Sequence, residues 1–266
     1  MTSSRGFLRV GAGRIECESY RTRAKAAAVA DGRPRLVFLH EGLGCCALWR
    51  DFPVAVAEAT GLDAFAYSRP GYGASQRGDA PMASVRYMHD EALEVLPQVL
   101  RAAGIKEHIL IGHSDGASIA IIYAGGSAAG GLRGLVLIAP HVFVEPLTLR
   151  SIAAARQAFE SGDLVARLKR WHGDNTAYAF HRWNDSWLDP DFARWNIEEY
   201  LPRIKVPALI IQGELDEYGS RAQIEAIERR MGSKARSVLL PECGHSPQRD
   251  QAQATLDEIA AFVKSL

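Results

Sequence analysis

The 266-residue sequence has no excess of charge of either sign, because 31 Lys and Arg residues balance 31 Asp and Glu residues. Chains that bind nucleic acid or an anionic membrane surface usually carry a basic excess, so neither partner is expected here. No uncharged apolar run approaches the roughly 18–20 residues that cross a bilayer, and the first residues lack the apolar core of a secretion signal. We therefore expect a soluble cytoplasmic protein.

Cysteine is also scarce, with only Cys17, Cys45, Cys46 and Cys243. None of them forms the CxxC spacing of a zinc or redox site, and adjacent cysteines such as Cys45 and Cys46 rarely bond to each other. We expect all four to be small packing side chains. Sensitivity to oxidation is the alternative, since three of them lie close in sequence to candidate site loops.

Short apolar segments that alternate with helical patterns dominate the chain. They indicate strands near Leu36–Leu39, Ala64–Tyr67, Ile109–Gly112, Leu135–Ala139, Ala208–Gln212 and Ser237–Leu240. Between several of these lie helical periods, clearest in Ser84–Ala103 and Gln251–Val263. Strands that are apolar on both faces and alternate with helices predict an α/β fold, with a mostly parallel central sheet covered by helices. An antiparallel hairpin, Phe7–Val10 with Arg14–Glu18, is expected to open the chain.

The most specific motif is Gly112–His113–Ser114–Asp115–Gly116, which follows an apolar strand and precedes an Ala-rich helix. Glycines let the backbone turn sharply and leave the Ser114 hydroxyl at the tip of the turn. The helix N-terminus behind it offers N–H groups and a positive dipole end, which suit an oxyanion. An ordinary helix N-cap is the alternative for this serine, but a nucleophile is the stronger prediction because two suitable partners follow.

Those partners come after the last two predicted strands. Asp216 follows the strand that ends at Gly213, and His245 lies in a Gly- and Pro-bounded loop after the final strand. A carboxylate that orients a histidine, and a histidine that accepts the serine proton, complete a catalytic triad. Glu214 and Glu217 remain alternatives for the acid.

The order Ser…Asp…His is the one that α/β-hydrolases use, and the chain resembles that family over nearly its whole length. Arg35–Gly44 resembles the family's third strand with its His-Gly-x-x-Gly oxyanion loop, and Tyr67–Ser75 resembles its Asp-x-x-Gly-x-Gly-x-Ser turn. Two positions depart from the pattern: Glu41 stands where the family has glycine, and Ser68 where it has aspartate. The resemblance implies that His40 and His113 are structural.

The regular spacing breaks once, between the strand that ends near Pro140 and the one that starts near Pro207. The segment is helical in pattern and aromatic, with Trp171, His172, Tyr178, Phe180, His181, Trp183, Trp187 and Trp195. It resembles the helical cap that many α/β-hydrolases insert above the nucleophile. We therefore expect a hydrolase core formed by residues 1–140 and 201–266, with residues 141–200 as a cap. The aromatic side chains pack the cap together or roof an apolar pocket.

The resemblance also implies an oxyanion hole and a pocket. The backbone N–H of Asp115 is one expected donor, and the second belongs to Gly42 or Leu43. The Asp115 carboxylate would oppose a developing negative charge, so we expect it to turn away or to find a cationic partner. Candidates to line the substrate pocket are Glu41, His141, Trp183 and Trp187.

Such a site predicts a serine hydrolase that cleaves a small ester, lactone or thioester through an acyl-enzyme. It requires a small-molecule substrate and neither a metal nor an organic cofactor, and a homodimer is possible. A hydrolase of C–C bonds in ring-cleavage products is the first alternative. The second is a ligand receptor that keeps the hydrolase fold without turnover. Sequence does not choose among these substrates.

Overall fold

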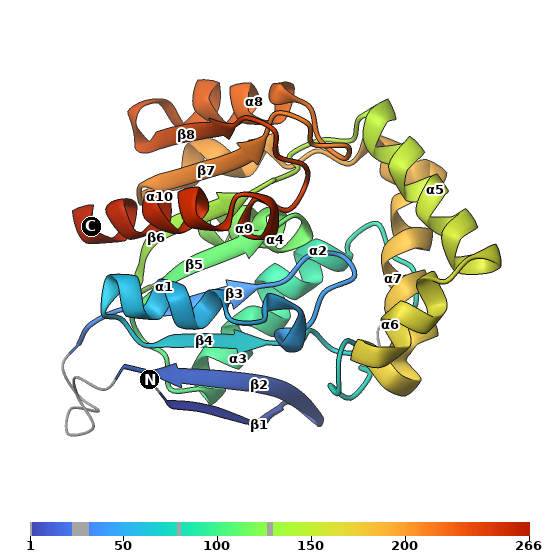
Figure 1. Cartoon of the computed structure of the whole chain (residues 1–266), viewed down its shortest axis with the longest axis horizontal. Helices are drawn as coiled ribbons and strands as arrows, with labels where there is room; N and C mark the ends of the chain where they lie inside the picture. The colour runs from blue at the N-terminus through green and yellow to red at the C-terminus, as the bar shows by residue number, and fades with distance from the viewer. Residues whose placement is uncertain (1, 23–31, 79–80, 127–129) are drawn as a thin grey trace.

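The computed structural model describes residues 2–22, 32–78, 81–126 and 130–266 (Figure 1). Within these ranges the strands form one eight-stranded sheet in the order β1-β2-β4-β3-β5-β6-β7-β8. Six strands, β3 to β8, run parallel, while β2 pairs antiparallel with both β1 and β4. The bounds are β1 Thr2–Val10, β2 Gly13–Arg21, β3 Arg35–Leu39, β4 Ala64–Tyr67, β5 His108–His113, β6 Leu132–Ile138, β7 Ala208–Gly213 and β8 Ala235–Leu240. The predicted α/β class and opening hairpin are confirmed.

Successive side chains of each parallel strand enter two different cores, which is why these strands are apolar at every position. In β3, Leu36 and Phe38 pack against α1 (Phe52–Thr60) and α10 (Ala252–Ser265) on one face. Val37 and Leu39 pack on the opposite face, against the layer formed by α3 (Leu96–Ala102), α4 (Asp115–Gly126) and α8 (Arg221–Met231). The two layers pack the sheet on both faces, below the loops at its carboxyl edge.

The helix expected over Ser84–Ala103 begins three residues later. It consists of α2 (Tyr87–Asp90), a π-helical turn η3 (Glu91–Val95) and α3. Ser84 stays outside the helix because its hydroxyl accepts the Arg86 N–H at 3.1 Å, a local hydrogen bond that competes with helix formation. The remaining short elements are η2 Cys46–Trp49, η7 Gly232–Lys234 and α9 Pro247–Asp250.

Residues 141–200 are largely helical, as expected. They contain α5 (Pro146–Ser161), α6 (Leu164–His172) and α7 (Thr176–Trp187), with the 3₁₀ turns η4 Gly173–Asn175 and η5 Pro190–Arg194 and the start of η6 Glu198–Arg203. Figure 1 shows α5, α6 and α7 grouped on the side toward which the parallel strands point. This places them near the loops that follow β3, β5 and β7.

Candidate active site

Ser114 occupies a sharp turn between β5 and α4. Its φ of +54° lies in the left-handed region, which a non-glycine residue adopts only where the surroundings enforce it. Steric clashes exclude any larger residue at the two flanking glycines. A Cβ on Gly112 would lie 2.3 Å from the Gly116 carbonyl oxygen, and a Cβ on Gly116 would lie 2.0 Å from the Leu39 carbonyl oxygen. Close packing of the turn against β3 therefore sets the position of the serine.

The structure brings Ser114, His245 and Asp216 together in one hydrogen-bonded chain. His245 Nε2 lies 2.9 Å from Ser114 Oγ, and His245 Nδ1 lies 2.8 Å from Asp216 Oδ1. Because Nδ1 faces a carboxylate, it carries the ring proton, and Nε2 is left free to accept the serine hydroxyl. These are the distances and tautomer that general-base activation of a serine needs.

Asp216 is fixed and ionised. Its Oδ1 also accepts the N–H groups of Tyr218 (2.8 Å) and Gly219 (3.1 Å), while its Oδ2 accepts from Gln212 Nε2 at 3.2 Å. Burial would raise the pKa of this carboxyl, but the hydrogen bond and charge of His245 and the Tyr218 N–H outweigh burial, so the pKa is lowered. A carboxylate held in this way can orient an imidazole.

The two alternative acids lie elsewhere. Glu214 is exposed, and the exposed Glu217 accepts the backbone N–H of His245 at 3.2 Å, with no contact to its ring nitrogens. Glu217 thus steadies the loop that carries the histidine.

The Asp115 side chain turns away from the serine into a buried polar cluster. Its Oδ2 accepts the Tyr87 hydroxyl at 2.6 Å and lies 3.5 Å from Arg69 Nη1, and its Oδ1 accepts Trp187 Nε1 at 3.3 Å. The expectation of a cationic partner is confirmed. The backbone N–H of this residue stays at the first turn of α4, beside Ser114.

His40 lies behind the loop formed by residues 41–44, as expected for a structural histidine. Its Nε2 accepts the Arg69 backbone N–H at 3.0 Å, so Nδ1 carries the proton and donates to the Glu41 carbonyl oxygen at 2.8 Å. Burial, with the nearby Arg69 charge, lowers the pKa of His40 well below its ordinary value. The ring is therefore neutral.

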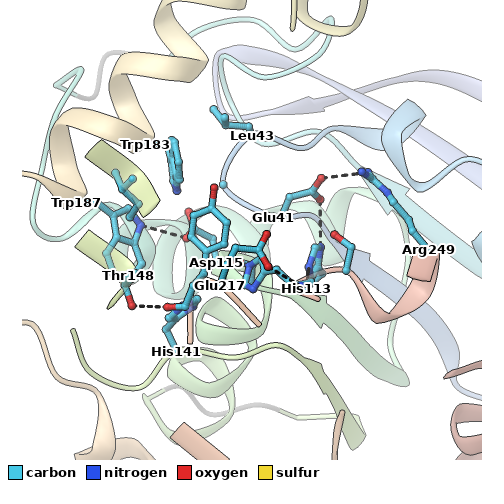
Figure 2. Close-up of a pocket in the computed structure, with 16 residues that line it drawn as sticks. Glu41, Leu43, His113, Asp115, His141, Thr148, Trp183, Trp187, Glu217 and Arg249 are labelled. Atoms are coloured by element: carbon cyan, nitrogen blue, oxygen red, sulfur yellow. Dashed lines mark hydrogen bonds and ion pairs between the residues drawn. The ribbon is translucent and has the colours of Figure 1, made fainter. Parts of the chain in front are cut away.

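A cavity of about 210 Å³ opens onto Ser114. All four pocket candidates from the sequence line it, together with both candidate donors in the loop after β3 (Figure 2). Trp183 and Trp187 lie on one side in Figure 2, and Glu41 lies on the other, between His113 and Arg249. The cavity is smaller than the 300–1,000 Å³ of sites for drug-sized ligands, which favours a small substrate.

His141 is a neutral member of this lining. Burial, aided by the neighbouring His245, lowers its pKa to about 4. Its Nε2 lies 3.2 Å from the Tyr218 carbonyl oxygen, and its ring centroid is 5.3 Å from that of Trp187. The ring therefore joins the loop of the acid to the helical segment.

Glu41, which replaces the family's glycine, makes two polar contacts at the cavity, one of them with a charged arginine. Its carboxylate lies 3.6 Å from His113 Nδ1 and 3.5 Å from Arg249 Nη2. His113 in turn donates from Nε2 to the His245 carbonyl oxygen at 2.8 Å. Sequence reasoning missed Arg249 as a cavity residue because it follows the histidine loop without a motif of its own.

Ser68, the second position that departs from the family pattern, forms a hydrogen bond with a carboxylate of another strand. Its hydroxyl donates to Glu16 Oε2 at 2.7 Å and accepts the Cys46 N–H at 2.9 Å, and the Ala74 N–H also donates to Glu16 Oε2. Glu16 of β2 thus places a carboxylate where the family pattern has its aspartate.

All four cysteines are buried and free, as expected for packing residues.

In the described ranges, no group of three or more His, Cys, Asp or Glu side chains is placed to hold a metal ion. Among the same residues, no helix has both the length and the apolar character required to cross a bilayer.

Comparison with known proteins places these features in a family. A sequence profile of the alpha/beta hydrolase family matches residues 36–258. The chain is 29% identical over 174 residues to N-formylmaleamate deformylase of Pseudomonas putida, covering 59% of this chain and 63% of that protein. It is 27% identical over 262 residues to the dihydrolipoyllysine-residue acetyltransferase component of the acetoin cleaving system of Pseudomonas putida, covering 88% and 64%. It thus spans slightly less than two thirds of the length of either relative.

Among solved structures, the enol-lactonase of Burkholderia xenovorans LB400 superposes with a TM-score of 0.73 at 18% identity, covering 97% of this chain and all of that one. This likeness concerns the fold. With the profile match over most of its length, the chain belongs to the alpha/beta hydrolase family.

Proposed function

We propose that this protein is a serine hydrolase that cleaves a small ester, lactone or thioester through an acyl-enzyme. The observation that carries the proposal is the hydrogen-bonded chain from Ser114 Oγ through His245 to Asp216, at 2.9 and 2.8 Å, with its serine end in a small cavity. Asp216 keeps the imidazole in the required tautomer and stabilises the imidazolium.

The reaction proceeds in two halves. His245 Nε2 takes the Ser114 proton as Oγ attacks the substrate carbonyl carbon, and the carbonyl oxygen becomes an oxyanion. Collapse expels the leaving group, which takes the proton from His245. Water, deprotonated by the same nitrogen, then attacks the acyl carbon. Collapse of this second intermediate breaks the bond to Ser114 Oγ, which takes the proton back from His245 as the acid leaves. The oxyanion is stabilised by the N–H of Asp115 and by that of Gly42 or Leu43, each contributing on the order of 3 kcal/mol.

The helical segment, residues 141–200, acts as a cap on the core formed by residues 1–140 and 201–266. Support comes from Ile152, Trp183 and Trp187, which reach the cavity from α5 and α7. Apolar side chains over the cavity exclude water from part of the acyl site and limit the size of the acyl group.

A second candidate substrate is an N-formyl amide. The observation in its favour is the match to the deformylase, which acts by name on N-formylmaleamate. A formyl group is the smallest acyl group, and it suits a cavity of about 210 Å³. The same triad and oxyanion donors serve an amide, with the nitrogen taking the proton as it leaves.

Turnover of matched substrates tests the proposal. We expect hydrolysis of p-nitrophenyl acetate and butyrate, with a sharp fall for the octanoate because the cavity is small. Ser114→Ala should reduce each rate to near background. N-formylmaleamate in the same assay tests the second candidate. A folded protein that cleaves none of these, or a Ser114→Ala variant as active as wild type, contradicts the proposal; binding without turnover then favours a receptor.

A further inference from the structure

Arg69, in the turn after β4, lies between the two segments that carry the candidate oxyanion donors. The residue is only 4% exposed. Its Nη2 donates to the Glu41 carbonyl oxygen at 2.8 Å and lies 3.4 Å from the Gly42 carbonyl oxygen. Its Nη1 lies 3.5 Å from Asp115 Oδ2. One guanidinium therefore contacts the loop after β3 and the first residue of α4 together.

The contact with the loop determines where an N–H group points. In a trans peptide the C=O of one residue and the N–H of the next point in opposite directions, and no described peptide is cis. With the Glu41 carbonyl directed at Arg69, the Gly42 N–H is directed away from the guanidinium. Gly42 lines the cavity that contains Ser114.

The Glu41 carbonyl is held by three donors. They are Arg69 Nη2 (2.8 Å), His40 Nδ1 (2.8 Å) and the Gly44 N–H (3.0 Å). Hydrogen bonds to a carbonyl polarise its amide and strengthen the N–H of the same unit as a donor. Within the described residues, the carbonyl of the next peptide, that of Gly42, has only the longer 3.4 Å contact with Arg69 Nη2. This difference makes the Gly42 N–H a stronger donor than the Leu43 N–H, and it favours Gly42 as the second oxyanion donor.

The contact between Arg69 and Asp115 offsets the negative charge of the Asp115 carboxylate. A buried carboxylate directly after the nucleophile would oppose the negative charge that develops on the substrate oxygen. Arginine stays protonated throughout the physiological pH range, so Arg69 offsets that carboxylate permanently. The Tyr87 hydroxyl and the Trp187 indole also donate to Asp115, but they are neutral.

We infer that Arg69 is a positioning residue for the oxyanion hole: it orients and polarises the Gly42 N–H through the Glu41 carbonyl and neutralises Asp115 beside the other donor. The inference rests on the proposed hydrolase function and concerns the same site. It assigns Arg69 an effect on the transition state, with little effect on substrate binding.

Substitution of Arg69 tests this with p-nitrophenyl butyrate and with a trifluoromethyl ketone, which adds to the serine and forms an oxyanion. For Arg69→Gln we expect kcat to fall at least about tenfold and the ketone's inhibition constant to rise by a similar factor, with KM within about twofold of wild type. Arg69→Lys keeps the buried charge without the two-pronged geometry, so it should also lose kcat. If Arg69→Gln does not fold, the Arg69→Lys variant still tests the inference.

The double variant Arg69→Gln/Asp115→Asn separates the two effects. It removes both charges, so a defect caused only by the uncompensated carboxylate would be rescued. We expect kcat to remain reduced, because the Glu41 carbonyl still lacks the charged one of its three donors. Rescue to wild-type kcat overturns the assignment of Arg69 to the Gly42 N–H.

Arg182→Gln is the matched control, since Arg182 is also a buried arginine that donates to a backbone carbonyl, that of Pro81. We expect its kcat to stay near wild type, and thermal unfolding should verify that each variant is folded. Unchanged kcat and ketone affinity in folded Arg69 variants overturn this inference alone. Lack of wild-type turnover overturns the proposed function, and this inference with it.

Discussion

His245 Nδ1 lies 2.8 Å from Asp216 Oδ1, and Asp216 is the only one of three neighbouring acids in the described loop that contacts the histidine ring. Asp216 is 8% exposed, whereas Glu214 is exposed and the exposed Glu217 accepts the backbone N–H of His245. The loop after β7 therefore presents one defined carboxylate to the imidazole. That geometry leads directly to the first prediction.

Asp216→Asn should lower kcat by about 10³- to 10⁴-fold, because an amide stabilises the wrong imidazole tautomer and no imidazolium. Glu214→Gln is the matched control and should leave kcat near wild type. Steady-state hydrolysis of p-nitrophenyl butyrate measures both. Equal rates in the two variants would show that the acid had been misassigned.

Ile152→Ala should move the acyl-chain optimum toward longer esters. Ile152 is 1% exposed and reaches the cavity from α5, so its loss enlarges the acyl site. The free energy of unfolding should fall by about 2–5 kcal/mol, the range for removing a buried aliphatic side chain. The assay compares kcat/KM across acetate, butyrate, hexanoate and octanoate esters.

Val165→Ala, at an exposed position of α6, provides the control for this shift. It should change neither chain preference nor stability by much. If Ile152→Ala keeps the wild-type preference, the acyl group does not occupy this cavity.

Acidification should destabilise the protein through His141. Its pKa is lowered to about 4 in the native state, against about 6.5 in an unfolded chain. Between these values the unfolded chain binds a proton that the native state does not, so stability falls as the pH falls. The loss from this one group approaches about 3 kcal/mol at pH 4.

Urea unfolding of wild type and His141→Asn at about pH 7 and about pH 4.5 measures this term. Wild type should lose about 2 kcal/mol more than the variant between the two conditions. Identical losses would mean that His141 is protonated in the native state well above pH 4.

Gly116→Ala should damage the fold and the site together. Its Cβ would lie 2.0 Å from the Leu39 carbonyl oxygen, so the turn that carries Ser114 must move away from β3. We expect a loss of about 1–3 kcal/mol of stability and a large loss of kcat. Gly6→Ala, whose Cβ meets nothing within 4 Å, should melt like wild type.

The predictable part of this protein is local in sequence. Strand–turn–helix around Ser114 combines an apolar run, two glycines and a helix pattern within a dozen residues, so its conformation follows from short-range chemistry. The strands near Leu36–Leu39 and Ala208–Gln212 are similarly readable because both of their faces are buried. The first residue of a helix is harder to predict. A single hydrogen bond to the Ser84 hydroxyl shifts the start of one helix by three residues.

The surroundings of the site depend on contacts between distant segments, which periodicity does not encode. Asp115 meets Tyr87 from α2 and Trp187 from α7, and Ser68 meets Glu16 from β2. The sequence signalled only that Asp115 needed a partner and that Ser68 departed from the family pattern. The packing of the helices on the sheet determines which side chains contact Asp115 and Ser68.

The most direct test of the account is the site of covalent modification by a fluorophosphonate, identified by peptide mass spectrometry. The account predicts one adduct, on Ser114, that forms rapidly in wild type, far more slowly in His245→Ala, and not at all in Ser114→Ala. An adduct on another residue, or no adduct on the folded wild-type protein, would contradict an activated serine at this position.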